Sequence, residues 1–314
     1  MQASLGIDVG SVSTKGVIID DEGRLLAGDY LETNGDPLAA VNRLLSSLRG
    51  QILGKVNITS VGTTGSARKL IGVMLGANAI KNEITAHAIG ALHRRPNLRT
   101  ILEIGGQDSK IILLSSGVVT DYAMNTICAA GTGAFLSSQA LRMGISVKEV
   151  GAGALRSEKP AKIAARCTVF AESDLIHKAQ AGHTKDDLLA GLCRAVVLNY
   201  LNNVAKGKQI HQPVVFQGGV SKNIGVVRAF ESELGCKIHL DSDSHLMGAI
   251  GSAILAKRAG NIHPFDFAVM DIPHKTRVTQ CGGCANNCEV VSFYQGERMI
   301  DWWGAKCERG RVSA

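Results

Sequence analysis

Apolar residues run through residues 5–19, break at a short polar turn and then resume, which predicts a strand, a turn and a second strand. This segment is LGIDVGSVSTKGVII, and the same pattern returns in residues 101–114 as ILEIGGQDSKIILL. A polar turn with glycine and a third predicted strand follow each copy. We therefore expect two copies of one β-sheet unit.

The two copies keep chemically matched residues in register. An acid, a glycine and a lysine recur at the same spacing: Asp8, Gly10 and Lys15 in the first copy and Glu103, Gly105 and Lys110 in the second. A small-residue turn between strands lets backbone N–H groups reach phosphate oxygens, and a lysine adds a positive charge. The pattern indicates a duplicated nucleotide-binding unit, with two ordinary β-hairpins as the alternative.

Both turns supply candidate phosphate-binding residues. They are Ser11, Val12, Ser13, Thr14 and Lys15 in the first turn and Gly105, Gly106 and Gln107 in the second. Carboxylates at strand ends suit Mg²⁺ or its waters. The candidates to hold Mg²⁺ or the attacking water are Asp8, Glu103, Gln107 and Asp108. The sequence alone does not rank these four.

A third glycine turn follows an apolar strand in PVVFQGGVSKN, residues 213–223. Gly218 and Gly219 would let the backbone lie against the nucleoside. Residues 246–256, LMGAIGSAILA, predict a helix whose small residues permit close packing, and ordinary core packing explains them equally well.

Composition narrows the class of protein. The 314 residues are 45% apolar, which is enough for one large or two ordinary domains. The net charge of +7 comes from scattered Lys and Arg, so it indicates no nucleic-acid partner. No signal peptide or membrane-spanning run is evident, and we expect a soluble, cytoplasmic protein whose eight cysteines are reduced. Cysteine clusters then point to metal binding.

Two cysteines precede predicted helices. Cys128 stands before AAGTG in NTICAAGTGAFLSSQALRMGI, residues 125–145, and Cys167 stands in ARCTVFAESDLIHKAQAGH. The predicted apolar faces are Leu136, Ala140 and Met143 in the first helix and Ala171, Leu175, Ile176 and Ala179 in the second. The partial positive charge at a helix start favours a thiolate and an anionic ligand.

The number of thiols suggests a shared site. A [4Fe–4S] cluster usually takes four thiolates, and this pair supplies two. A two-fold axis would supply the other two from a second chain. Two buried structural cysteines are the alternative, which spacing alone favours.

The turn motifs together resemble the phosphate 1, phosphate 2 and adenosine motifs of the actin–hexokinase–heat-shock-protein ATPase superfamily. That resemblance implies a duplicated α/β fold with ATP and Mg²⁺ between two domains. The segments LGIDVGSVSTKGVI, EIGGQDSK, CAAGTGAFL, CTVFAESDLI and FQGGVSKN more closely resemble the activators (component A) of 2-hydroxyacyl-CoA dehydratases. That family includes the ATPase subunits of benzoyl-CoA reductases, and the similarity runs from about residue 5 to about residue 258.

This resemblance implies a homodimer with one [4Fe–4S] cluster held by Cys128 and Cys167 of each subunit. Gly131 and Gly133 would then link the cluster to the nucleotide. ATP hydrolysis would drive an electron onto a 2-hydroxyacyl-CoA dehydratase or a related double-cubane-cluster reductase, with a ferredoxin- or flavodoxin-like donor. Two rivals remain: a small-molecule kinase of the same fold, and a nucleotide-switched binding module that moves no electron.

The last part of the chain differs in composition. Residues 259–280 predict a connector with two prolines, and CGGCANNCEVVSFYQGERMIDWWGAKCERG follows. A hairpin around the QGE turn would bring together Cys281, Cys284, Cys288 and Cys307, which suits Zn²⁺ or an iron–sulfur cluster, with a metal-free tail as the alternative. This tail resembles a segment of longer, multidomain activator-like proteins. We expect three segments: residues 1–95, 96–258 and a cysteine-rich extension, 259–314.

Overall fold

The computed structural model describes residues 1–52, 56–125, 128–260 and 263–308. The chain divides into two compact units, the first formed by residues 1–82 and 252–314 and the second by residues 83–251. The cysteine-rich tail thus belongs to the first unit, and the helix at residues 83–94 belongs to the second. The final residues of the expected third segment, 309–314, lie outside the described residues.

The first unit is built on a five-stranded sheet of order β3-β2-β1-β4-β5. Its strands are β1 (Gln2–Val9), β2 (Ser13–Ile19), β3 (Leu25–Glu32), β4 (Asn57–Thr64) and β5 (Ala79–Ile80). β1 pairs antiparallel with β2 and parallel with β4. Helix α1 (Pro37–Ile52) packs Leu44 so close to β2 that a Cβ on Gly16 would lie 2.7 Å from it. Helix α2 (Arg68–Met74) follows β4.

The second unit repeats this sheet with order β10-β9-β6-β7-β8. Its strands are β6 (Thr100–Ile104), β7 (Ser109–Ser115), β8 (Val118–Asn125), β9 (Val214–Gln217) and β10 (Ile238–His239). The order matches strand for strand, and Asp8 lies opposite Lys15 in the first sheet as Glu103 lies opposite Lys110 in the second. The predicted duplication is confirmed.

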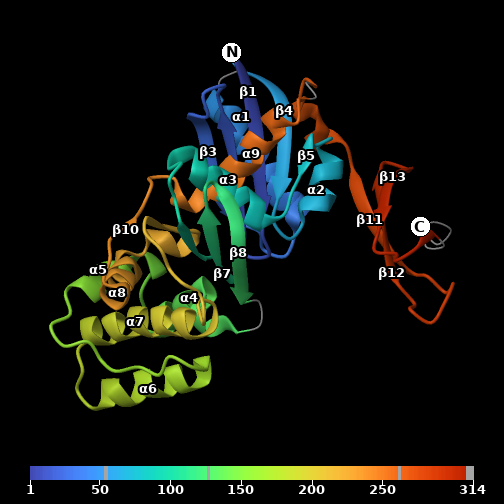
Figure 1. Cartoon of the computed structure of the whole chain (residues 1–314). Helices are drawn as coiled ribbons and strands as arrows, with labels where there is room; N and C mark the ends of the chain where they lie inside the picture. Colours follow the sequence, from blue (N-terminus) through green and yellow to red (C-terminus); the bar gives the residue numbers. More distant parts are fainter. Residues whose placement is uncertain (53–55, 126–127, 261–262, 309–314) are drawn as a thin grey trace. The chain divides into compact units, whose positions relative to one another are not determined.

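The two copies differ in the segment after the third strand. In the residues that the structure describes, the first copy has α1 alone, whereas the second has the turn η1 (Ala129–Gly131) and four helices. These helices are α4 (Gly133–Arg142), α5 (Val150–Leu155), α6 (Thr168–Gln180) and α7 (Lys185–Asn203). Helix α7 contacts α5, α6 and η1, and also α8 (Ile224–Leu234) (Figure 1). The insertion therefore forms one helical layer around α7, and both predicted cluster cysteines lie in it.

The predicted buried face of α6 is partly wrong. Ala171 and Leu175 are buried as expected, but Ile176 is 54% exposed and Ala179 is exposed as well. The apolar residues of α6 therefore lie on two faces of the helix. One face is buried in the core and the other is exposed.

Two further helices are α3 (Glu83–Arg94) and α9 (Met247–Arg258). The close packing predicted for the small residues of α9 is confirmed. A Cβ on Gly251 would lie 1.8 Å from the carbonyl oxygen of Ala86, so glycine is needed there.

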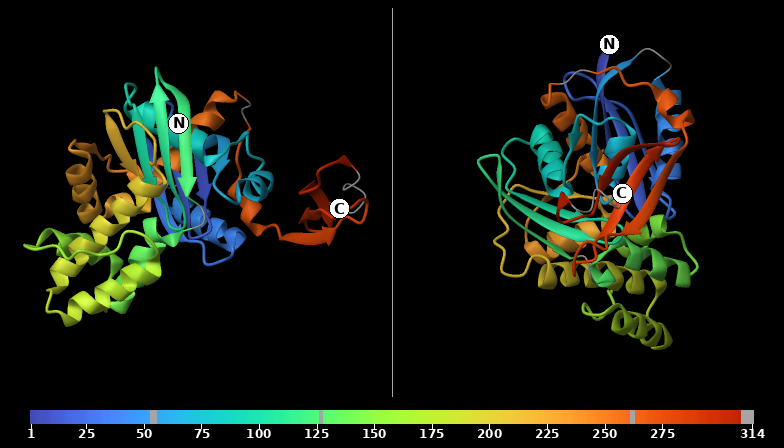
Figure 2. Two further views of the ribbon diagram at one scale, coloured as in Figure 1. Left: turned by 60° about the horizontal axis from the view of Figure 1, so that its bottom comes forward. Right: turned by 90° about the vertical axis from the view of Figure 1, so that its right-hand side faces the viewer.

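The tail forms a three-stranded antiparallel sheet of order β11-β12-β13 (Figure 2). Its strands are β11 (His274–Gln280), β12 (Glu289–Gln295) and β13 (Arg298–Trp303), so the predicted hairpin is confirmed. β11 lies in the segment predicted as connector, where that prediction was wrong. Phe293 of β12 is fully buried in the hydrophobic core of the first unit, which ties the tail to that unit.

In the described part of the chain, no helix has the length and apolar character needed to cross a membrane.

Candidate functional site

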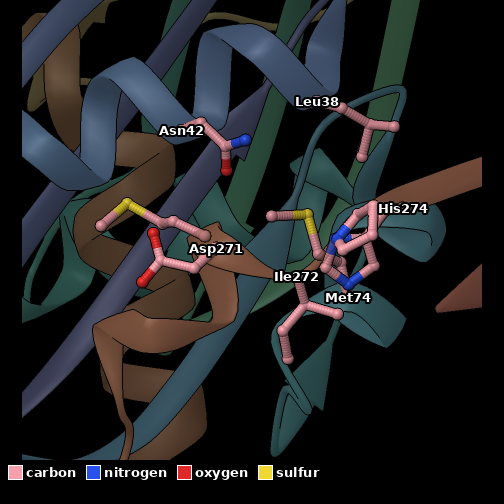
Figure 3. A pocket seen from close by; sticks show the side chains of 8 residues that line it. Leu38, Asn42, Met74, Asp271, Ile272 and His274 are labelled. Atoms are coloured by element: carbon pink, nitrogen blue, oxygen red, sulfur yellow. The ribbon is translucent and has the colours of Figure 1, made fainter. Parts of the chain in front are cut away.

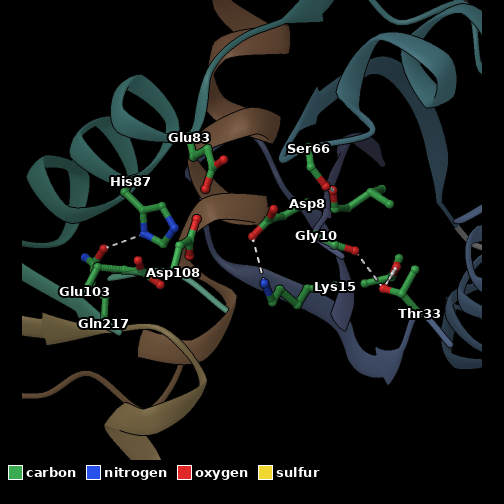
Figure 4. A network of polar contacts seen from close by, with 12 residues as sticks. Asp8, Gly10, Lys15, Thr33, Ser66, Glu83, His87, Glu103, Asp108 and Gln217 are labelled. Atoms are coloured by element: carbon green, nitrogen blue, oxygen red, sulfur yellow. Dashed lines mark hydrogen bonds and ion pairs between the residues drawn. The ribbon is translucent and has the colours of Figure 1, made fainter. Parts of the chain in front are cut away.

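The first phosphate turn lies between β1 and β2. The Gly10 N–H donates to the carbonyl oxygen of Ser13 at 2.9 Å, and the Thr33 hydroxyl donates to the Gly10 carbonyl at 2.8 Å. The Lys15 ammonium lies 3.1 Å from Asp8 Oδ2 (Figure 4). Thr33, which directly follows β3 and is far from this turn in the sequence, was not predicted. Its hydrogen bond to Gly10 stabilises the conformation of the turn.

The predicted residues of this turn have different surroundings. Ser11 and Val12 are exposed at its tip, whereas the side chains of Ser13 and Thr14 are buried. Thr14 Oγ1 lies 2.9 Å from the Thr33 hydroxyl. The tip is therefore the part of the turn that can meet a ligand.

A further turn follows β4 at the same sheet edge, and sequence reasoning missed it. Gly65 has φ +91°, and a Cβ there would lie 2.4 Å from the Val9 carbonyl oxygen. The Ser66 hydroxyl donates to that carbonyl at 3.2 Å. Because β1 and β4 are parallel, their carboxyl ends meet. A glycine among small residues directly after a strand, TTGS, was the available signal.

The second phosphate turn joins β6 to β7 and is highly charged. The ammonium of Lys110, 1% exposed, lies 2.8–3.0 Å from three carboxylates. These carboxylates belong to Glu83, Glu103 and Asp108. Glu83 comes from α3 and was not predicted. Gln107 is exposed at the tip of the turn.

Burial and charge oppose each other at this cluster. Burial disfavours the charged lysine, but the carboxylates of Glu103, Glu83 and Asp108 outweigh it and raise the pKa of Lys110. Burial raises the pKa of the Glu103 carboxyl, and the nearby ammonium opposes that rise. Three carboxylates facing one ammonium leave an excess of negative charge at this turn.

The third glycine turn packs on the end of β6. Gly218 has φ +86°, and a Cβ there would lie 2.3 Å from the Ile104 carbonyl oxygen. Gly219 begins the short helix η3 (Gly219–Lys222). Beside this turn, His87 Nδ1 lies 2.8 Å from Gln217 Oε1, a buried contact from α3 that the sequence did not reveal (Figure 4).

Cys128 and Cys167 both lie where a helix or helical turn begins. Cys128 is half-buried and precedes η1, while Cys167 is exposed and caps α6. The Asn125 side chain holds the first cysteine on both sides, accepting from its N–H at 3.0 Å and donating to its carbonyl at 2.8 Å. By contrast Cys193 is buried, and burial raises the pKa of its thiol to about 12. This cysteine therefore belongs to the core.

The segment after Cys128 is bonded directly to the second phosphate turn. The first N–H groups of α4, from Gly133 and Ala134, donate to the carbonyl oxygens of Gly105 and Gly106 at 2.9 and 2.8 Å. A Cβ on Gly133 would lie 2.9 Å from the Gly105 oxygen, so this approach needs a glycine. The phosphate turn and the Cys128 segment are thus joined within one unit.

Cysteine thiolates are the donors that an iron–sulfur cluster takes. Cys128 and Cys167 are two accessible thiols of one helical layer, half of what a four-iron cluster takes. Thiolate donors at helix starts suit an iron–sulfur cluster, since its net charge is negative.

The tail cysteines are not assembled into a metal site. The Cys281 N–H donates to the Cys288 carbonyl at 2.8 Å, which joins the ends of β11 and β12, whereas Cys284 and Cys307 are exposed. In the described ranges, no three His, Cys, Asp or Glu side chains form a group that could hold a metal ion. Metal binding by the tail stays a prediction.

A cavity of about 220 Å³ lies in the first unit, where the segment before β11 meets α1 (Figure 3). Its lining is Leu38, Asn42, Met74, Met270, Asp271, Ile272, Pro273 and His274. None of the predicted nucleotide or cluster residues lines it.

Residues 5–256 match the BadF/BadG/BcrA/BcrD ATPase family. The chain is 34% identical over 254 residues to the (R)-2-hydroxyglutaryl-CoA dehydratase activating ATPase of Acidaminococcus fermentans, an overlap of 81% of this chain and 96% of that protein. The crystal structure of component A of that dehydratase superposes with a TM-score of 0.77 at 33% identity, covering 83% of this chain and 100% of the other.

An activator of 2-hydroxyisocaproyl-CoA dehydratase from Clostridium difficile, solved with bound ADPNP, gives a TM-score of 0.76 at 32% identity over 82% of this chain and 96% of its own. These similarities confirm the predicted α/β ATPase fold and the resemblance inferred from the motif order. The tail after residue 258 lies beyond the family match.

Proposed function

The chain belongs to the BadF/BadG/BcrA/BcrD ATPase family, and we propose that it is an ATP-driven electron-transfer activator working as a homodimer. The observation that carries this proposal is the pair of bonds to the second phosphate turn from Gly133 and Ala134, which lie five and six residues after Cys128. Through these bonds a change at the nucleotide can reach a cysteine. A kinase of this fold has no need of such a link.

The proposed electron acceptor follows from the relatives. Those named above are activators of 2-hydroxyacyl-CoA dehydratases. We infer that this chain serves a dehydratase of that type or a related double-cubane-cluster reductase, and receives electrons from a ferredoxin- or flavodoxin-like donor.

Cys128 and Cys167 of both subunits would hold one [4Fe–4S] cluster at the dimer axis. The bound cluster would supply one-electron transfer at low potential. The protein would hold the thiols in position. Asn125 bonds to the backbone N–H and carbonyl of Cys128, and Cys167 is the residue at which α6 begins.

Exposed apolar side chains beside the cysteines support the dimer. Val169 and Phe170 lie in the first turn of α6, two and three residues after Cys167, and are 65% and 64% exposed. Leu141 on α4 is 79% exposed. Arg142 and Glu172 form an ion pair at 2.5 Å that holds α4 and α6 together. Burying side chains of this size contributes about 1.5–3 kcal/mol each, as an upper estimate.

The nucleotide residues have proposed roles that follow from their placement. Asp8, Glu103, Gln107 and Asp108 would position Mg²⁺ or the attacking water, and Lys15 would neutralise phosphate charge. Backbone groups of both phosphate turns would bind the phosphates, while Gly218 and Gly219 would face the nucleoside.

The experiment that tests the proposal also separates the rivals. The protein is purified without oxygen, and its iron, sulfide, oligomeric state and ATP hydrolysis are measured. We expect a dimer with about four iron and four sulfide in the shared cluster and ATP hydrolysis without a phosphoryl acceptor. Phosphorylation of an added small molecule would favour the kinase. An iron-free dimer that binds nucleotide normally would favour the binding module.

We further propose that Cys281, Cys284, Cys288 and Cys307 bind one metal ion or cluster within a single chain. Cys284→Ser should then remove zinc, or iron additional to the shared cluster, because a site with four thiolate ligands loses affinity with any of them. Elemental analysis per chain measures this. Cys236→Ser, at a partly buried cysteine outside the tail, serves as the control. Unchanged zinc and iron in Cys284→Ser would rule the site out.

A further inference from the structure

In the described part of the chain, the Cys167 segment makes no direct bond to the second phosphate turn of the kind that the Cys128 segment makes. Among the described residues, the backbone just before Cys167 is held instead by Asn199 of α7. The Asn199 amide donates to the carbonyl oxygens of Ala165 and Arg166 at 3.2 and 2.7 Å. Asn199 is only 1% exposed, so these bonds form in the interior, where they are stronger than at the surface.

The other end of the same amide contacts the Cys128 segment. A Cβ on Gly131 would lie 2.8 Å from Asn199 Oδ1, so the turn η1 rests against this side chain. Oδ1 is buried and accepts no hydrogen bond from the described residues. An unpaired buried acceptor is unfavourable, and a shift of η1 that gave it a backbone N–H would relieve that penalty. Asn199 therefore contacts both cysteine segments, but within the described ranges its side chain is hydrogen-bonded only to the segment before Cys167 and not to the turn after Cys128.

The next residue on α7 reaches the nucleotide side. The hydroxyl of Tyr200 donates to the backbone carbonyl oxygen of Lys110 at 2.7 Å, and Tyr200 is fully buried. Its ring packs edge-on against Phe230 at 5.3 Å between centroids. Lys110 is the lysine whose ammonium bonds to Glu103 and Asp108 of the second phosphate turn.

We propose that Asn199 and Tyr200 are positioning residues that transmit the nucleotide state of the second phosphate turn to the Cys167 segment through α7. This inference rests on the proposed function for its biological purpose. The two cysteines would have separate links: Cys128 through α4 and its bonds to Gly105 and Gly106, and Cys167 through α7. Since both cysteines would serve one cluster, the two links together would move its ligands in concert.

The test measures the thiols themselves and needs no electron acceptor. The full chain is freed of iron with a chelator, and the alkylation rates of Cys128 and Cys167 are followed by mass spectrometry with and without Mg-ADPNP. Cys236 is the internal reference. In the parent, the nucleotide should change both rates, by about fivefold or more if the coupling is typical.

Tyr200→Phe removes one hydroxyl and keeps the ring packing. It should retain nucleotide binding and the response of Cys128, while the response of Cys167 should be lost. Asn199→Ser should give the same pattern. The matched controls are Tyr122→Phe and Asn202→Ser, whose side chains are exposed, and both should behave like the parent.

Three outcomes would overturn the proposal. The Cys167 response could persist in both variants, both cysteines could lose their response equally, or the parent could show no response at all. The labelling result tests the link through α7, whereas the iron content of the isolated protein tests the proposed electron-transfer function. A protein that lacks iron as isolated but shows the expected labelling pattern would keep the α7 link and refute the electron-transfer role.

Discussion

Replacing Cys128 or Cys167 with alanine should remove about two iron atoms per chain, half of a four-iron cluster, and weaken the dimer. Each subunit supplies only these two thiols to the proposed site, so one substitution removes two of the four ligands from a symmetric dimer. The ATPase units should stay folded, because Cys167 is exposed and Cys128 is half-buried. Iron content and electron paramagnetic resonance of protein purified without oxygen measure the loss.

Cys193→Ala is the contrasting control. Cys193 is buried in the core, so its replacement should lower stability while the iron content stays that of the parent. If Cys128→Ala and Cys167→Ala keep the parent's iron content, the shared cluster does not exist.

Lys110→Met should reduce the free energy of unfolding by about 3–5 kcal/mol at neutral pH. The substitution leaves the buried Glu103 and the partly exposed Glu83 and Asp108 facing one another without their shared cation. Chemical denaturation of parent and variant measures the difference. Lys208→Met is the matched control: Lys208 pairs with the exposed Asp121 at 2.7 Å, and such pairs contribute little.

The loss of stability in Lys110→Met should depend on pH in a definite direction. The raised pKa of Lys110 means that its contribution is complete below the lysine's ordinary pKa and is lost only in strongly alkaline solution. In the variant, burial raises the pKa of Glu103 without the opposing Lys110 ammonium, so acidification protonates this carboxylate and removes its repulsion of the other two. The deficit should therefore shrink as the pH falls through the raised pKa of Glu103 toward the ordinary pKa of a glutamate carboxyl, about 4.3. A deficit that grows on acidification would contradict this account of the cluster.

The parts of the fold that were predictable are those with local signals. The acid, glycine and lysine that recur in both copies define strand ends and turn length. These in turn fix the cross-strand register of Asp8 with Lys15 and of Glu103 with Lys110. The hairpin at the QGE turn was predictable for the same reason.

The parts that were not predictable depend on long-range packing. Glu83 and His87 belong to an ordinary amphipathic helix, and only the contact of α3 with its sheet brings them to Lys110 and Gln217. Asn199 and Tyr200 lie in an apolar helix whose sequence gives no sign of what their polar atoms reach. Ile176 was assigned to the core because an apolar residue that is exposed and one that is buried look alike in sequence.

The most direct test of the central claim is the ATP dependence of electron transfer. The protein is reduced without oxygen and mixed with its dehydratase or double-cubane acceptor, and its oxidation is followed by absorbance with and without Mg-ATP. Because a nucleotide can shift a conformational equilibrium only by binding one state more tightly, the activated state should form only with the nucleotide. We expect rapid oxidation with Mg-ATP and almost none without it, and equal rates in the two mixtures would contradict the account even if the protein hydrolyses ATP.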